Sequence, residues 1–129
     1  VHDAARPLTP PQVTERVIDA VAGGAGAVIP VLPVTDTLKT VDASGVAVGT
    51  PRRSDMVAVQ TPQGFRWDVL IRAHEEGASL GADEARAATD DAGLVEAIGG
   101  TVHTVAGDER SMKVTRPLDL ALAQILVAE

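Results

Sequence analysis

The sequence predicts an α/β fold in which helices flank a mostly parallel sheet and a β-hairpin is inserted. A nearly all-apolar run at 25–32, bounded by Gly and Pro, is typical of a strand that is buried on both faces of a sheet. Helical and strand patterns alternate before and after this run. Alternating residues on both sides of a turn-forming tetrad at 42–45 predict the hairpin.

Composition limits the function classes. The 129 residues suffice for one domain or part of one. The chain has no cysteine, which excludes disulfides, thiolate metal sites and a cysteine nucleophile, and fits a cytoplasmic protein. A net charge of -7 and an aromatic content of 2% argue against nucleic acid as a partner, because such binding needs basic side chains and stacking platforms.

The apolar runs are too short for a membrane helix. The run at 25–32 falls far below the ~20 residues that a span requires, and no charged-then-apolar leader opens the chain. We therefore expect neither a membrane partner nor a signal peptide. The chain begins with Val1 rather than Met, and 1–3 have the pattern of a strand end, so we expect a fragment.

A first helix is predicted after the opening segment. Thr9 is expected to cap it, because Pro follows in the first turn and Gln12 stands three residues later. Its apolar face repeats every four residues, at Val13, Val17 and Val21. Gly23 and Gly24 end it, and the buried strand follows. Strand end, helix and strand form a βαβ unit, and ligands of such sheets lie beyond the carboxyl ends of strands, where His2, Asp3 and Arg6 stand.

The middle of the chain contains the hairpin and a short helix. Alternation at 34–41 and 46–48 flanks the turn, and the hairpin is expected to protrude. A strand is predicted at 56–60 and a helix at 67–76, which Gly77 ends. The Ala- and charge-rich stretch at 79–88 is interpreted as a loop that leads into a helix.

Two helices and one or two strands complete the chain. Asp90 and Asp91 begin a helix that continues to Ile98. Acidic residues at the start of a helix suit the positive end of its dipole. A strand is expected at 101–105 and a second at 111–114. Thr115 is predicted to cap the last helix, whose apolar stripe comprises Leu118, Leu122, Ile125 and Leu126.

Several apparent motifs carry no function. The Gly-rich segment 23–26 follows a helix and precedes a strand, whereas a phosphate-binding loop follows a strand and opens a helix. None of the serines lies in a Gly-x-Ser-x-Gly elbow. His74 and His103 lack a second histidine at metal-ligand spacing. Asp90 and Asp91 are interpreted first as a helix start and second as a site.

Five ordered motifs remain. They are Val-His-Asp-Ala-Ala-Arg-Pro at 1–7, Pro-Val-x-Asp-Thr-x-Lys at 33–39, Gln-Thr-Pro-Gln-x-Phe at 60–65, Thr-Asp-Asp-Ala at 89–92 and Lys-Val-Thr-x-Pro-x-Asp-Leu at 113–120. In this order they resemble the C-terminal half of the 2-C-methyl-D-erythritol 4-phosphate cytidylyltransferase family. The resemblance covers essentially the whole chain, from Val1 to about Val127.

The resemblance implies an activity and a fold. Members transfer CMP from CTP to methylerythritol phosphate in the non-mevalonate isoprenoid pathway and release pyrophosphate, with Mg²⁺ as the divalent cation. The implied fold is a Rossmann-like sheet, of which 1–129 would be the C-terminal portion of one domain. The hairpin, at about 34–57, would be the family's dimerisation arm, so a homodimer is expected.

The resemblance also implies site residues. The positions expected to bind methylerythritol phosphate are Asp3, Arg6, Thr37, Arg53, Thr61 and Lys113. Lys113 and Asp3 would be catalytic, Lys113 by facing the developing phosphate charge and Asp3 by orienting magnesium-bound phosphates as a metal ligand. Arg and Lys neutralise phosphate, and threonine hydroxyls donate to phosphate or polyol oxygens.

Alternatives stay open for each residue. Asp3 could cap a turn, Thr37 could pack across strands, and Lys113 could be an edge-strand lysine. Thr61 precedes a proline and could serve backbone shape alone. Arg52 competes with Arg53 for the substrate contact, although the spacing to Thr61 favours Arg53. Arg53 and Thr61 are further expected to complete a partner subunit's pocket.

The Gly-rich, basic loop that binds CTP in this family has no counterpart in the sequence. We therefore expect a truncated form that is inactive alone and whose CTP-binding residues cannot be assigned. Two other functions stay open, a cytidylyltransferase for another polyol phosphate of the ribitol phosphate type and a non-catalytic dimerisation fragment.

Overall fold

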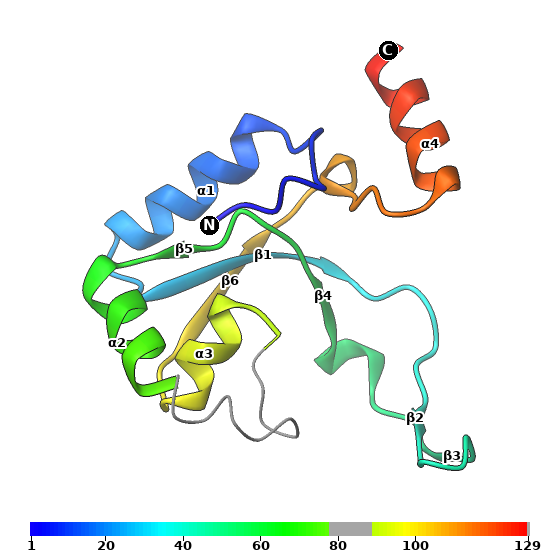
Figure 1. Ribbon diagram of the computed structural model, residues 1–129, viewed down its shortest axis with the longest axis horizontal. Coiled ribbons are helices and arrows are strands. Elements are labelled where there is room, and N and C mark those ends of the chain that lie inside the picture. The colour runs from blue at the N-terminus through cyan, green and yellow to red at the C-terminus, as the bar shows by residue number, and fades with distance from the viewer. Residues whose placement is uncertain (78–88, 129) are drawn as a thin grey trace.

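The computed structural model describes residues 1–77 and 89–128 and has the expected α/β architecture (Figure 1). The predicted loop-to-helix stretch at 79–88 lies outside the described residues. Within the described ranges, every helix is too short or too polar to cross a bilayer.

Strand β1 (Ala27–Pro33) is the centre of the sheet and confirms the predicted buried strand. It pairs in parallel with β6 (Val102–Ala106), and antiparallel with β4 (Val57–Val59) and β5 (Gly64–Phe65). The sheet formed by the described strands is therefore mixed rather than mostly parallel. The reason is that β4 and the unpredicted β5 both run back along β1, one at each end.

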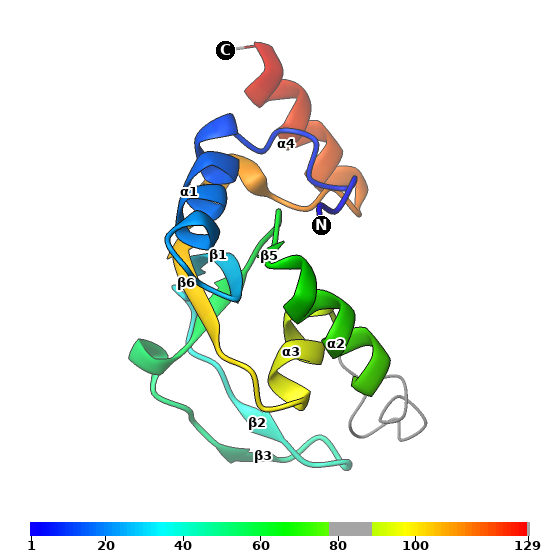
Figure 2. The same cartoon turned by 90° about the vertical axis from the view of Figure 1, so that its left-hand side faces the viewer.

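Helices cover both faces of this sheet. Helix α1 (Pro11–Ala22) lies on one face, and α2 (Trp67–Gly77) and α3 (Asp91–Ala97) lie on the other (Figure 2). The core between the sheet and these two helices contains fully buried small side chains, namely Ala27, Ala73 and Val95. Small residues allow the helices to approach the strands closely, and partly buried residues such as Phe65 and Leu94 close the gaps.

The arm, which we define as residues 34–57, carries the predicted hairpin. Strands β2 (Thr40–Val41) and β3 (Ala47–Gly49) are shorter than predicted, and a short 3₁₀ helix (Arg53–Asp55) precedes β4. The Asp42 carboxylate accepts hydrogen bonds from Ser44 and from the Val46 N–H, and Gly45 adopts a φ of 84°. The Ser44 hydroxyl, followed by the Val46 N–H, lowers the pKa of Asp42. This turn is thus stabilised by local contacts.

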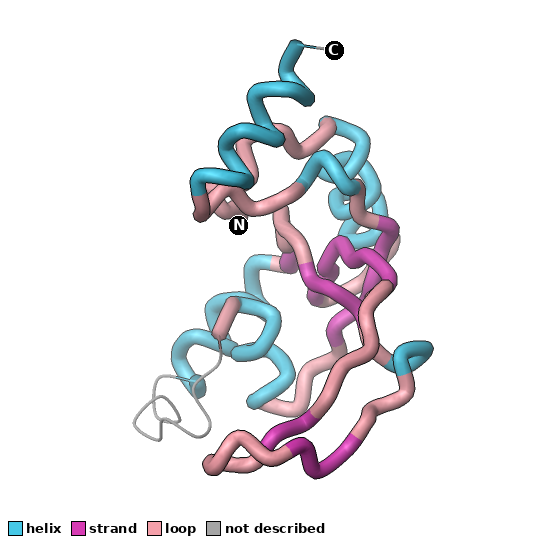
Figure 3. Tube along the Cα trace, turned by 90° about the vertical axis from the view of Figure 1, so that its right-hand side faces the viewer, coloured by secondary structure: helices cyan, strands magenta, loops and turns pink. Residues whose placement is uncertain are grey.

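Helix α4 (Pro117–Ala128) and the hairpin lie at opposite ends of the molecule (Figure 3). Asp119 in the first turn accepts hydrogen bonds from the Thr115 and Arg116 N–H groups and from the Thr115 hydroxyl. These bonds lower the pKa of Asp119, the Thr115 N–H contributing most. The Thr115 hydroxyl therefore donates to the Asp119 carboxylate, whereas the predicted cap would accept a hydrogen bond from a backbone N–H of the helix.

The predicted cap of α1 is wrong as well. Pro10 is the N-cap and makes no side-chain capping bond, and the Thr9 hydroxyl turns back to donate to the Arg6 carbonyl. The cap of α3 is confirmed, because the Asp90 side chain accepts from the Gly93 N–H at 2.8 Å.

Two predicted strand segments are not strands. Residues 1–3 have no regular structure. Val1 exchanges two backbone hydrogen bonds with Gln63, but this pairing does not extend to the next residues, so no strand forms. In the predicted strand 111–114, Ser111 ends a 3₁₀ helix (Glu109–Ser111), and residues 112–114 have no regular structure. The Val114 N–H donates to the Ala5 carbonyl at 2.7 Å, so this segment joins a loop rather than a sheet.

Candidate functional site

Four of the six predicted site residues come together in what we call the corner, defined by Asp3, Arg6, Thr61 and Lys113. Three segments build it. They are the opening loop 1–7, the connection 60–63 between β4 and β5, and the loop 107–116 that follows the carboxyl end of β6. The sequence places these segments far apart, and the sheet brings them to one place.

Asp3 and Lys113 form the charged centre of the corner. The Lys113 Nζ lies 2.9 Å from Asp3 Oδ2, and Asp3 Oδ1 accepts from the Ala5 N–H at 3.0 Å. The hydrogen bond from Lys113, followed by that from the Ala5 N–H, lowers the pKa of Asp3 below its ordinary value of 3.8. The side chains are 32% and 51% exposed, so the pair is open to a ligand.

Thr61 joins the opening loop to the sheet. Its Oγ1 accepts from the Asp3 N–H at 3.0 Å and lies 2.8 Å from His2 Nδ1. The Thr61–Pro62 peptide bond is cis. Thr61 thus lies beside Asp3 of its own chain, whereas we expected it to reach a partner subunit together with Arg53.

Arg6 links two of the corner's segments. Its guanidinium donates to the carbonyls of Ser111 and Val59. Burial lowers the pKa of Arg6, and the nearby Asp3 opposes this shift. An arginine stays charged in proteins even when it is partly buried, so Arg6 adds a positive charge near the Asp3–Lys113 pair. Its role in substrate binding stays a prediction.

A hollow of about 190 Å³ opens at the corner. Its lining includes two predicted site residues, Asp3 and Thr61, and also Val1, His2, Gln63, Asp90 and Asp91. Gln63 is 4% exposed, donates to Asp90 Oδ2 at 2.8 Å and accepts from the Ala92 N–H at 3.2 Å. Gln63 belongs to the motif at 60–65 but was not among the predicted site residues, although polar residues on both sides of Thr61 in an otherwise apolar stretch were a signal.

The other two predicted residues, Thr37 and Arg53, lie on the arm. Arg53 donates to the Thr35 carbonyl at 2.8 Å and lines a second hollow with Pro33, Val34, Thr35 and Ser54. The competing Arg52 is paired with Asp55 at 2.9 Å, and its side chain is 83% exposed. The two arginines therefore face different surroundings. Thr37 is exposed on the segment that leads to β2.

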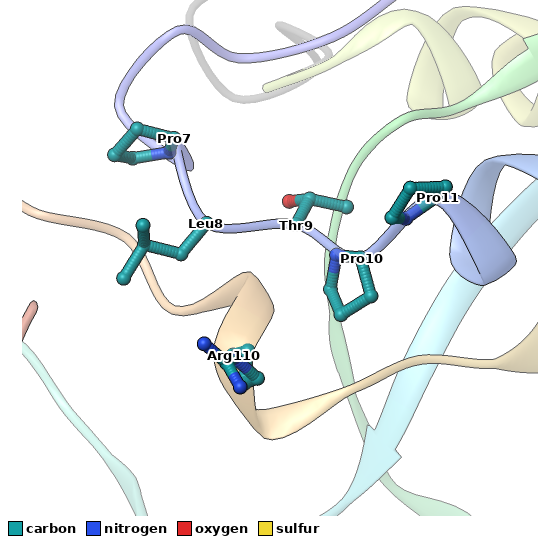
Figure 4. A pocket seen from close by; sticks show the side chains of 6 residues that line it. All are labelled: Pro7, Leu8, Thr9, Pro10, Pro11 and Arg110. Carbon is teal, nitrogen blue, oxygen red and sulfur yellow. The ribbon is translucent and has the colours of Figure 1, made fainter. Parts of the chain in front are cut away.

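A third hollow lies beside the corner, between the start of α1 and the 3₁₀ helix at 109–111 (Figure 4). It is lined by Pro7, Leu8, Thr9, Pro10, Pro11 and Arg110. The Arg110 guanidinium donates to the Leu126 carbonyl of α4 at 2.8 Å. Three prolines offer no N–H donor, so this hollow is poorly suited to a phosphate, and the corner is the better candidate site.

The described residues contain no ready-made cluster of metal-ligating side chains. Groups of three His, Cys, Asp or Glu side chains that could hold a metal ion do not occur within 1–77 and 89–128. Both Asp3 oxygens already accept hydrogen bonds, from Ala5 and Lys113. Asp3 therefore stays a predicted metal ligand only.

Comparison with known proteins decides the family. The family model of IspD, 2-C-methyl-D-erythritol 4-phosphate cytidylyltransferase, matches residues 1–129. The chain belongs to this family. It is 53% identical to the 2-C-methyl-D-erythritol 4-phosphate cytidylyltransferase of Rhodococcus jostii, over 100% of this chain and 54% of that protein. A similar relative from Frankia casuarinae is 56% identical, over 99% of this chain and 46% of its own length.

Solved structures of the IspD family have the same fold. The 2-C-methyl-D-erythritol 4-phosphate cytidylyltransferase of Thermus thermophilus matches with a TM-score of 0.84 and 40% identity, over 100% of this chain and 61% of that one. The bifunctional IspDF of Campylobacter jejuni matches with a TM-score of 0.71 and 28% identity, over 94% of this chain and 29% of that one. These neighbours confirm the Rossmann-like fold class. The chain spans about half the length of the curated relatives it matches.

Proposed function

We propose that this chain supplies the sugar-phosphate half of a cytidylyltransferase, which transfers CMP from CTP to 2-C-methyl-D-erythritol 4-phosphate and releases pyrophosphate. The observation that carries the proposal is the Asp3–Lys113 pair beside Thr61, with Asp3 and Thr61 lining an open hollow. It combines a cation for a phosphate, a hydroxyl for an oxygen ligand and a carboxylate for a polyol hydroxyl.

The reaction needs positioning and charge stabilisation rather than a covalent nucleophile. A phosphate oxygen of methylerythritol phosphate attacks the α-phosphorus of CTP in line, the bond to the β-phosphate oxygen breaks, and pyrophosphate leaves. Lys113 Nζ faces the charge that develops on the transferring group. Asp3 holds Lys113 in place before substrate arrives and accepts from a polyol hydroxyl. Arg6 adds a second fixed positive charge.

Magnesium supplies charge neutralisation for the phosphates of CTP in this proposal. Because the described residues offer no set of metal ligands, we assign no step to the ion. The nucleotide half of the site would come from sequence beyond the motifs present here. A cytoplasmic location, expected from the lack of cysteine, stays a prediction.

The arm is proposed to mediate a two-fold homodimer. Its exposed apolar side chains are Val41, Val46, Val48, Met56 and Val57, with exposures between 37% and 63%. An exposed strand pair with this many valines is an unpaired edge, and a symmetric second arm would cover it. In such a dimer Arg53 and Thr37 would reach the corner of the partner and contribute the remaining phosphate contacts.

The test is turnover in a full-length protein that carries this chain, with CTP, magnesium and either methylerythritol phosphate or ribitol phosphate. We expect pyrophosphate release with methylerythritol phosphate and at least tenfold lower catalytic efficiency with ribitol phosphate, since the corner's donors are placed for one polyol. Faster turnover of ribitol phosphate would assign the related activity instead. No turnover of either would leave the dimerisation fragment as the better account.

A further inference from the structure

Gln60 stands immediately before Thr61, at the end of β4, and is 5% exposed. Its backbone N–H donates to the Pro30 carbonyl on β1 at 2.8 Å. Its side chain reaches to the loop that follows β6. The amide Nε2 donates to the Asp108 carbonyl at 2.9 Å, and Oε1 accepts from the Asp108 N–H at 3.0 Å. One side chain thus satisfies both backbone groups of Asp108.

The place where Gln60 docks is built for it. Gly107 donates its N–H to the Val31 carbonyl at 2.9 Å, and a Cβ at this position would collide with Gln60 Oε1. β1 lies between β4 and β6, so the Gln60 side chain bridges the two strands that flank the centre of the sheet. A glycine at 107 gives the room for this bridge.

Asp108 is also the start of the turn that leads to Lys113. Its carboxylate accepts from the Arg110 N–H at 2.8 Å, and its carbonyl accepts from the Ser111 N–H at 3.0 Å. Two residues after this turn comes Lys113, whose Nζ pairs with Asp3. The position of Asp108 therefore sets where the turn ends and where Lys113 is presented.

We propose that Gln60 is a positioning residue of the site, which fixes the Lys113 loop relative to Thr61 through its two hydrogen bonds to Asp108. The inference deepens the proposed function and rests on it. Thr61 is tied to Gln60 by the chain itself, and Lys113 is tied to it through Asp108. A single buried amide thereby sets the spacing between a hydroxyl donor and a cation on one substrate phosphate.

A purely structural role is the competing account, because a buried amide whose partners are removed destabilises any protein. A double-mutant cycle separates the two roles. The variants are Gln60→Met, which has similar size and cannot bond Asp108, Lys113→Ala, and the combination. Gln60→Glu, which keeps only the acceptor, replaces Gln60→Met if the latter does not fold. Val95→Ala, a fully buried residue of α3, is the control for lost stability.

In a full-length protein that carries this chain, Gln60→Met should lower kcat/KM by about tenfold when Lys113 is present. In the Lys113→Ala background it should lower kcat/KM by less than about twofold, because its effect passes through Lys113. Val95→Ala should lower the unfolding temperature and change kcat/KM by less than about twofold in both backgrounds. An equal loss from Gln60→Met in both backgrounds, or no loss beside Lys113, overturns the inference.

Amide hydrogen exchange gives a readout that is independent of the substrate. In Gln60→Met the Ser111 and Val114 N–H groups should exchange at least about tenfold faster, while the N–H groups of β1 stay protected. Unchanged exchange at Ser111 and Val114 would contradict the inference even in a protein that uses another substrate. If the full-length protein shows no turnover but Gln60→Met speeds exchange at Ser111 and Val114, the result counts against the proposed function and not against the role of Gln60.

Discussion

The corner and the arm both contain predicted site residues, but different kinds of contact hold these residues in place. In the corner, Asp3 forms an ion pair with Lys113, which is about a hundred residues away in the sequence. The Asp3 N–H also donates a hydrogen bond to Thr61, which is 58 residues away. On the arm, Arg53 bonds the nearby Thr35 carbonyl, and the hairpin turn is held by contacts within a few residues of Asp42. The corner is held by contacts between distant segments, whereas the arm, apart from its last residue, is held by contacts among its own residues.

This difference shows which part of the site is ready before a partner binds. The corner presents a charged pair and a hydroxyl in a defined arrangement, so it can bind a phosphate at little cost in ordering. The arm exposes valines and an arginine that other described parts of the chain do not cover. In the proposed homodimer, a second copy of the chain covers the arm and completes the site.

The largest effect is expected from removing the tip of the arm. Deletion of 39–49 should abolish the proposed homodimer, because it removes β2, β3 and the exposed Val41, Val46 and Val48. Light scattering measures the mass, and circular dichroism checks that the helices remain. A milder variant, Val46→Asp with Val48→Asp, should weaken the dimer without deleting backbone. A dimer that survives both changes would assign association to another surface.

In the corner, Lys113→Ala should have the greatest kinetic effect. Loss of a charged hydrogen bond costs about 1.5–3 kcal/mol, so kcat/KM should fall tenfold to a hundredfold, with kcat affected as well as KM. The reason is that Lys113 faces charge that develops only during transfer. Steady-state kinetics in a full-length protein decides this. A rise in KM with kcat unchanged would make Lys113 a binding residue only.

The arginine pair tests the arm at the level of one side chain. Arg53→Ala should raise the KM for methylerythritol phosphate about tenfold and leave CTP affinity nearly unchanged. Arg52→Ala is the matched control, since its partner is the exposed Asp55 and such surface pairs contribute little. If Arg52→Ala is as damaging as Arg53→Ala, or if Arg53→Ala impairs CTP binding, our assignment is reversed.

The smallest effect concerns two carboxylates, Asp3 in the corner and Asp42 on the arm. Both pKa values lie below 3.8, so each carboxylate stabilises the fold above the unfolded pKa of ~3.9. That contribution is lost as the pH falls through the folded pKa. Salt should raise the pKa of Asp3, which depends on Lys113, more than that of Asp42, which depends on neutral donors. Titration by NMR at two salt concentrations measures both, and equal shifts would contradict the comparison.

The sequence predicted the parts of the fold that depend on local pattern. The four-residue spacing of Val13, Val17 and Val21 predicted α1, and the apolar run predicted β1. It missed β5, since two residues give no periodicity, and it placed a strand at 111–114 where Val114 instead bonds the opening loop. Pairing across the sheet decides such short segments.

The same limit applies to the site. Family motifs led to Asp3 and Lys113, and the structure brings them together. Motifs did not separate Arg52 from Arg53, which differ in their partners. They contain Gln60 and Gln63 but did not indicate a role for either. The roles of these two glutamines depend on Asp108 and Asp90, each more than 25 residues away, and no spacing rule connects them.

Subunit mixing tests most directly that the arm of one protomer completes the corner of another. The two parents are a full-length protein with Lys113→Ala and one with Arg53→Ala, and each should be impaired alone. The two proteins are unfolded, mixed in equal amounts and refolded together. If the arm acts across the dimer, each mixed dimer contains one intact site, and activity should recover to about a quarter of the unmodified protein. If both residues serve the corner of their own chain, the mixture will be no more active than the average of its two parents, and the account is contradicted.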